Sequence, residues 1–182
     1  MWTAGRFSSC AGAGIQCRSE GLDNNNDNND NNDNNDKEKH MQTALNIVYG
    51  DWKTYQHEAE RVRAMVFIAE QKVPRELEFD EDDKTAEHFI AFDARHMVLG
   101  CARLLTSGRI GRVAVLRPFR GRGIGEALMK AVLERAKARG MKDVHLAAQV
   151  QAMPFYERLG FEPFGDEFDE AGIAHRMMRR VL

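Results

Sequence analysis

The residues best suited to chemistry in this chain lie in a turn rich in arginine and glycine. The turn runs from Arg120 to Gly125, between the apolar segment 112–116 and a helical pattern that begins at Ile124. Glycines leave backbone N–H groups uncovered, the start of a helix adds partial positive charge, and arginines add full charge. These features together favour an anion, and a pyrophosphate fits them well.

Three interpretations of the turn compete at this point. A P-loop requires Gly-Lys-Ser/Thr, but Glu126 follows Gly125. The dinucleotide fingerprint requires a third glycine three residues after the second, and Glu126 or Leu128 occupies that position. In the third interpretation the glycines only make a tight connection between a strand and a helix.

Composition restricts the class of protein. The 182 residues suffice for one domain, and a formal net charge of -2 gives no argument for a nucleic-acid partner. No apolar run reaches the roughly 20 residues that a membrane helix needs, so no membrane partner is expected. Cys10, Cys17 and Cys101 form no spaced cluster, which favours a reducing, cytoplasmic compartment and no metal site. Cys101 is expected to be a small core residue.

The first forty residues differ from the rest of the chain. Every residue from Asp23 to Asp36 is Asn or Asp, which predicts a disordered extension over residues 1–40. A targeting segment and an upstream start codon are the alternatives, and Met41 is then the natural beginning. A single domain is expected over residues 41–182.

Periodicity predicts an α/β domain with a mixed sheet. Strands are expected over 45–49, 88–92, 97–105, 109–115, 144–148, 161–164 and 173–179, and helices over 52–71, 124–139 and 152–159. Asp51 should cap the first helix and Pro74 should end it. The apolar segment 144–148 is expected to be buried on both faces.

The turn does not stand alone, because four segments in order are similar to one family. Residues 120–125 resemble the R/Q-x-x-G-x-G/A acyl-CoA signature of the GNAT superfamily of N-acyltransferases. Residues 152–161 resemble its A-x-x-F-Y-x-x-x-G-F segment. Segments 66–74 (with Asp80, Asp83 and His88) and 168–175 resemble the ElaA-like branch. The resemblance extends from about Leu45 to the C-terminus.

The resemblance implies a fold and an activity. The fold is a mostly antiparallel central sheet, flanked by helices and splayed between the strands at 112–115 and 144–148. The activity is acyl-CoA-dependent N-acyl transfer, with an acetyl group passing from acetyl-CoA to a primary amine by direct attack and no metal involved. A non-catalytic CoA-binding module of the same fold is the alternative. The acceptor is expected to be a small-molecule or peptide amine, and a homodimer stays open.

The resemblance also implies which residues bind the cofactor. Main-chain N–H groups of residues 122–125 would hold the pyrophosphate, and a Cβ at Gly123 or Gly125 would block its approach. Backbone groups of Val113 and Val115 would bind the pantetheine arm and polarise the thioester. Gln149 stands where many relatives have Asn. The predicted cofactor-binding set is Val113, Ala114, Val115, Arg120, Gly121, Arg122, Gly123, Ile124, Gly125 and Gln149.

Candidate catalytic residues come from other segments. The resemblance makes Tyr156 the general acid that protonates the CoA thiolate, while an ordinary core tyrosine is the alternative. Glu70 and His88 are the candidate bases for the amine. The pattern leaves open whether His145 points into the splay. The acidic segment 76–83 is either a solvated loop or an entrance that attracts a cationic amine.

Overall fold

The computed structural model describes residues 45–182, so the predictions for residues 1–40 and for a start at Met41 lie outside the described residues. The strands are β1 (Asn46–Gly50), β2 (Glu87–Phe92), β3 (Val98–Leu104), β4 (Ile110–Val115), β5 (Asp143–Gln149), β6 (Glu162–Glu170) and β7 (Ile173–Val181). The α-helices are α2 (Trp52–Arg63), α3 (Arg75–Glu78), α4 (Ile124–Ala138) and α5 (Met153–Arg158). This order confirms the predicted α/β class.

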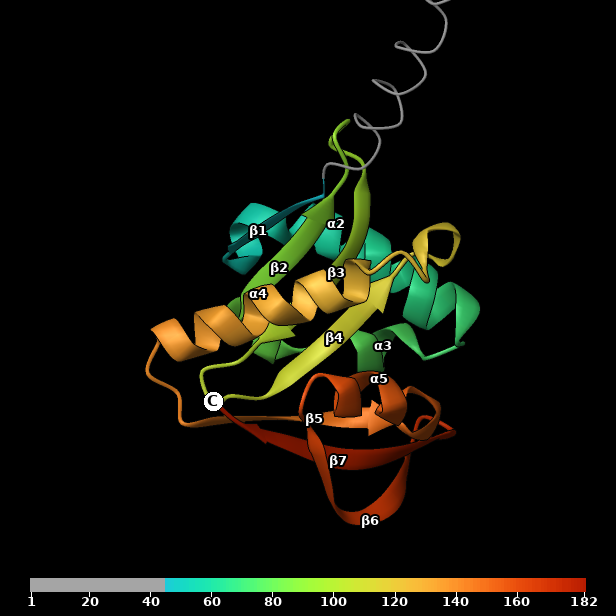
Figure 1. Cartoon of the computed structure of the whole chain (residues 1–182). Helices are drawn as coiled ribbons and strands as arrows, with labels where there is room; N and C mark the ends of the chain where they lie inside the picture. Colours follow the sequence, from blue (N-terminus) through green and yellow to red (C-terminus); the bar gives the residue numbers. More distant parts are fainter. Residues whose placement is uncertain (1–44) are drawn as a thin grey trace, which may run out of the picture.

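The strands form two antiparallel sheets that separate between β4 and β5 (Figure 1). The first sheet has the order β1-β2-β3-β4, and the second has the order β5-β7-β6. The predicted splay between these two strands is therefore confirmed. Strand β4 is an edge strand of the first sheet, and β5 is an edge strand of the second. Each therefore directs unpaired backbone groups toward the opening.

The two sheets meet at one end of the splay. Arg109 and His145 form an isolated parallel bridge, and the backbone N–H of His145 donates to the carbonyl oxygen of Gly108 at 3.1 Å. A Cβ on Gly108 would lie 3.0 Å from the carbonyl oxygen of Asp143, and its φ is +83°. Glycine at this position therefore allows the strands to approach here. Beyond this bridge they diverge toward Val115 and Gln149.

Helices cover both faces of the first sheet (Figure 1). Helix α4 buries Ile124, Leu128, Val132 and Ala136, which is the predicted apolar face. These side chains join a core that also includes residues of β5 and β7, so the core connects the two sheets. Helix α2 packs on the opposite face, against a second cluster around Ile90.

The first helix differs from its prediction. Asp51 caps α2 as expected, because its carboxylate accepts from the backbone N–H of Thr54 at 2.9 Å. The helix then widens into a π-helical segment, η1 (Ala64–Glu70). The helix ends before Pro74, because Lys72 has a left-handed φ of 63°. Pro74 instead precedes α3, within the segment expected to be a loop.

Two strands of the second sheet also differ from expectation. Strand β5 is buried on one face only, since Val144, Leu146 and Ala148 are buried and the alternate residues are not. The prediction of burial on both faces was wrong, because the other face borders the splay. Strand β6 is longer than predicted and is exposed along its length. It pairs only with β7.

Candidate functional site

The glycine-rich turn has the geometry of an anion site. A short 3-10 turn, η3 (Arg117–Phe119), leads from β4 to Gly121 and Gly123, whose φ angles are 75° and 78°. Gly123 is the N-cap of α4, so the backbone N–H groups that follow have no acceptor within the helix. A Cβ on either glycine meets nothing within 4 Å. The positive φ therefore demands glycine here, and the uncovered N–H groups suit a phosphate.

Gly125 differs from Gly121 and Gly123, because its φ is not positive. A Cβ there would lie 3.5 Å from the Phe155 ring and 3.8 Å from Cγ2 of Val115, which are ordinary van der Waals contacts. Neither backbone conformation nor packing within the protein therefore requires glycine at this position. Its predicted role in the approach of a phosphate stays a prediction.

Arg120 is committed to neighbours within the protein. Its Nη1 and Nη2 donate to the two carboxylate oxygens of Glu70 at 2.6 and 2.8 Å, and its Nε donates to the carbonyl oxygen of Val115 at 2.9 Å. The carboxylate of Glu70 thus offsets the positive charge of Arg120, which was predicted to help bind a pyrophosphate. Arg122 is exposed, with its guanidinium 5.7 Å from the Phe119 ring centroid. Arg122 is therefore the signature arginine whose charge faces solvent.

Strand β4 presents its free edge to the splay. Ala114 faces the core and pairs with Cys101 of β3, while Val113 borders the splay. The ladder with β3 shifts register between Cys101 and Arg103, opposite Arg112, which has a positive φ of 53°. This bulge turns the Arg112 side chain toward α3. Burial raises the pKa of the Cys101 thiol to about 12, which confirms it as an inert core residue.

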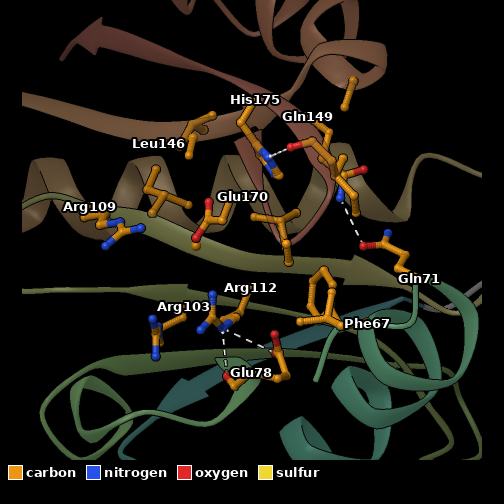
Figure 2. A pocket seen from close by; sticks show the side chains of 18 of the residues that line it. Phe67, Gln71, Glu78, Arg103, Arg109, Arg112, Leu146, Gln149, Glu170 and His175 are labelled. Atoms are coloured by element: carbon orange, nitrogen blue, oxygen red, sulfur yellow. Dashed lines mark hydrogen bonds and ion pairs between the residues drawn. The ribbon is translucent and has the colours of Figure 1, made fainter. Parts of the chain in front are cut away.

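A cavity of about 330 Å³ lies within the splay. Figure 2 shows that its walls come from β4, β5, β7, α3 and the end of the π-helical segment. Residues of special interest in its lining are Phe67, Gln71, Glu78, Arg109, Arg112, Gln149, Tyr156, Glu170 and His175. Charged and polar side chains therefore share the lining with apolar ones, and a concave site with convergent polar groups can orient a small molecule.

Tyr156 reaches this cavity from α5. Its ring contacts Phe155 and Phe161 edge-on, with centroid separations of 4.9 and 5.9 Å. Burial raises the pKa of Tyr156 to about 12, so the phenol stays protonated at neutral pH. No described residue hydrogen-bonds to its hydroxyl, and that oxygen is not sealed from solvent. The phenol is therefore a free proton donor at the cavity wall.

The comparisons with known proteins bear on this geometry. Residues 53–182 match the family model described as the acetyltransferase (GNAT) domain. The chain belongs to the GNAT acetyltransferase family. It is 37% identical over 123 residues to the uncharacterized N-acetyltransferase YjcF of Bacillus subtilis, covering 65% of this chain and 87% of that protein.

Solved structures agree with the family assignment. Escherichia coli ElaA is 34% identical over 131 residues, which cover 67% of this chain and 84% of ElaA. The crystal structure of ElaA superposes with a TM-score of 0.69 and 27% identity, over 75% of this chain and 99% of that one. An acyl-CoA N-acyltransferase from Pseudomonas aeruginosa gives a TM-score of 0.68 at 28% identity, over 76% and 100%. The predicted ElaA-like resemblance is thereby confirmed.

The two bases predicted from the sequence do not lie at the cavity. Glu70 forms the exposed pair with Arg120, whose hydrogen bond lowers the pKa of that carboxyl and makes it a weaker base. His88 is buried, with its Nε2 2.9 Å from the carbonyl oxygen of Asp83 and its ring 4.8 Å from that of Trp52. Burial lowers the pKa of His88. His145 does not line the cavity either.

The acidic segment is more than the solvated loop that is one alternative for it, because two of its carboxylates are buried in ion pairs. The other alternative, an entrance that attracts a cationic amine, stays a prediction. Arg63 donates to Glu78 and to Asp83 at 2.7 Å each, and Arg103 donates to Asp83 at 2.7 Å. We call the whole set the arginine–carboxylate cluster; its members are Arg63, Glu78, Asp80, Asp83, Arg103 and Arg112. Within the segment, Glu78 and Asp83 are buried, whereas Glu76, Leu77, Asp80, Glu81 and Asp82 are exposed. The cluster ties the segment to α2, β3 and β4.

Sequence reasoning missed two residues of the site, Glu170 and His175. Both lie in the segment that resembles the ElaA-like branch, but neither spacing nor periodicity there indicated a role. The β6–β7 hairpin brings them to the cavity through a two-residue turn, where Ala171 and Gly172 have positive φ. The backbone N–H of Gly172 donates to the Asp169 carboxylate at 2.9 Å, which stabilises the turn.

Gln149 bridges the two sides of the splay. Its Nε2 donates to Oε1 of Gln71 at 3.0 Å (Figure 2). Its Oε1 accepts from Nε2 of Gln151 at 3.1 Å. The first bond links the end of β5 to the end of the π-helical segment. Gln149 lines the cavity, as its place in the predicted cofactor-binding set requires, although its side chain is engaged with protein groups.

In the part of the chain that the structure describes, residues 45–182, no helix combines the length and the apolar character that crossing a membrane requires.

Proposed function

We propose that this protein is an acyl-CoA-dependent N-acyltransferase that transfers an acetyl group from acetyl-CoA to a primary amine by direct attack. One observation carries the proposal. A free phenol, that of Tyr156, borders a cavity between the unpaired edges of β4 and β5, and its helix packs against the start of α4 beside the anion-binding turn.

The residues present fit acetyl-CoA. The N–H groups after Gly123 and the exposed Arg122 suit a pyrophosphate, and the free edge of β4 offers backbone donors and acceptors to an extended amide-bearing arm. Backbone N–H groups at that edge are fixed dipoles, and they can stabilise the oxyanion that forms on the thioester carbonyl. The buried surroundings strengthen these interactions by excluding water.

Tyr156 would complete the reaction. The neutral amine attacks the carbonyl carbon of the thioester, a C–N bond forms and the C–S bond breaks. The departing sulfur takes the proton of the Tyr156 hydroxyl, which is protonated at neutral pH because its pKa lies well above 7. The attacking nitrogen gives up one proton as the amide forms, and an equivalent proton returns to the Tyr156 phenolate, so that the products are the amide and the free thiol of CoA. The acceptor would be a small-molecule or peptide amine, and Glu170 in the cavity lining offers a carboxylate to a cationic amine.

An acetyl-CoA thiol-release assay against a panel of primary amines tests the proposal. We expect amine-dependent release of free CoA, with the acetylated amine identified by mass spectrometry. Calorimetric titration of acetyl-CoA into the same protein is the matched measurement. Tight binding without release by any amine would contradict the enzyme and favour the non-catalytic CoA-binding module.

A further inference from the structure

His175 occupies a position on β7 that directs its side chain to the cavity. It pairs with Gln149 on β5 and with Phe168 on β6. Residues directly opposite one another on neighbouring strands share a face of the sheet, so His175 and Gln149 point to the same side. Both line the cavity (Figure 2). Tyr156 also belongs to its lining.

Hydrogen bonding determines which ring nitrogen of His175 carries the proton. Nδ1 lies 2.8 Å from the carbonyl oxygen of Ile173. A carbonyl oxygen only accepts, so Nδ1 must carry the hydrogen. In the neutral ring Nε2 then carries the lone pair and is the proton acceptor. The ring of Phe168, stacked at 25° and 6.0 Å between centroids, holds the imidazole plane.

Nε2 of His175 is accessible from the cavity. No described residue hydrogen-bonds to it, although the residue is only 9% exposed. Among side chains in residues 45–182, Arg103 Nε is the sole nitrogen or oxygen atom that is both sealed from solvent and unpartnered. Nε2 is therefore unpartnered but open, and the cavity is the space that His175 lines. His88 differs, because its Nε2 contacts a backbone carbonyl.

We infer that His175 is the proton acceptor for the attacking amine, an inference that rests on the proposed function. As the C–N bond forms, the amine nitrogen becomes cationic and passes one proton to Nε2 of His175. Tyr156 gives its proton to the departing sulfur. The imidazolium then returns its proton through water to the phenolate, so that the net products are an amide and the free thiol of CoA.

The charged surroundings favour such a transfer. A carboxylate, Glu170, lies at the same cavity and can stabilise both an entering ammonium group and the imidazolium that forms. The charged or titratable side chains that line the cavity beside His175 are Glu78, Arg103, Arg109, Arg112, Tyr156 and Glu170. The charges of Glu78 and Arg112 are matched within the arginine–carboxylate cluster, which leaves Glu170 as the carboxylate free of that cluster.

Substitution of His175 by Asn gives a sharp test. The Asn amide can keep the hydrogen bond that Nδ1 makes to the Ile173 carbonyl, whereas the acceptor at Nε2 is lost. With an alkylamine at neutral pH, kcat should fall about 10²–10³-fold while the Kd for acetyl-CoA stays the same. The difference in kcat between His175→Asn and the wild type should narrow as the pH approaches the pKa of the amine, because base from the solvent then replaces the missing imidazole. His145→Asn, on β5 and outside the cavity lining, is the matched control.

Chemical rescue separates a base from a structural residue. Free imidazole added to His175→Ala should restore part of kcat without changing acetyl-CoA binding, and it should not stimulate Tyr156→Phe. A wild-type pH profile in His175→Asn would overturn the inference, as would a loss that neither pH nor imidazole restores. If wild-type protein releases no CoA with any amine, the proposed function fails and this inference with it. If only the inference about His175 is wrong, the wild-type protein still releases CoA when an amine is added.

Discussion

Two groups of buried polar side chains flank β4, and they differ in how fully their hydrogen-bonding capacity is used (Figure 2). In the arginine–carboxylate cluster every carboxylate meets at least one guanidinium, and among the side-chain atoms of the cluster only Arg103 Nε is both buried and without a partner. At the cavity, the Tyr156 hydroxyl and His175 Nε2 have no partner among the described residues. Satisfied groups stabilise the fold, whereas unpaired groups that water or a ligand can reach are available for proton transfer.

We expect the two groups to control different properties of the protein. Substitutions in the cluster should lower the free energy of unfolding and leave the rate of the chemical step unchanged. Substitutions at the cavity should slow the chemical step and leave the free energy of unfolding nearly unchanged. The arrangement of the two regions makes this separation testable, because Arg103, Arg112 and Glu78 border both of them.

Tyr156→Phe is expected to give the largest effect. The ring and its contacts with Phe155 and Phe161 stay, and only the donor to the departing sulfur is lost. kcat should fall about 10²–10⁴-fold, with little change in the Kd for acetyl-CoA or in the free energy of unfolding. Single-turnover acetyl transfer measures the effect. Tyr49→Phe, which removes a half-exposed phenol on β1, is the control.

Unchanged single-turnover transfer in Tyr156→Phe would contradict the comparison and return Tyr156 to the role of a core residue. The same conclusion would follow if the free energy of unfolding fell by as much as the activation free energy of acetyl transfer rose.

Local signals predicted much of the fold and the geometry of the glycine-rich turn, and distant pairings account for the rest. The face of α4 and the turn at Gly123 follow from spacing over a few residues. By contrast, Arg63 meets Glu78 and Asp83 across 15 and 20 residues, and a charge run cannot reveal such partners. His175 reaches the cavity only because β7 pairs with β5, which local periodicity does not encode.

Asp83→Asn tests the cluster. The carboxylate receives hydrogen bonds from Arg63 and Arg103 at 2.7 Å each, and all three side chains are at most 3% exposed. Removing the charge leaves two buried guanidinium groups undercompensated, so the free energy of unfolding should fall by about 3–5 kcal/mol. Urea denaturation gives the value, with the exposed neighbour Asp82→Asn as control. Acetyl-CoA affinity of the folded fraction should not change.

Acid titration refines the same prediction. Burial raises the pKa of Asp80 and Asp83, but their hydrogen bonds and charge pairing with arginines outweigh it, so both pKa values lie below the ordinary value. Their stabilisation is complete above about pH 4, the unfolded pKa, and is lost as the pH falls through the lower folded pKa. Glu78 acts in the opposite sense, because burial raises its pKa.

The stability gap between wild type and Asp83→Asn should therefore close as the pH falls from 5 toward 2. Urea midpoints at intervals across this range measure it. A gap that persists unchanged at the lowest pH would show that the charge of Asp83 does not carry the effect.

Glu70→Gln should produce the smallest effect, and it decides between the sequence prediction and the geometry. Glu70 is paired with Arg120 at the surface, so its loss should change stability by no more than about 1 kcal/mol. Arg120 keeps its bond to the Val115 carbonyl and regains an unmatched charge beside the turn, so acetyl-CoA should bind up to about fivefold more tightly at low salt. kcat should be unchanged, because Glu70 is outside the cavity lining. A fall of a hundredfold or more in kcat, with a flattened pH profile, would instead make Glu70 the base and remove that role from His175.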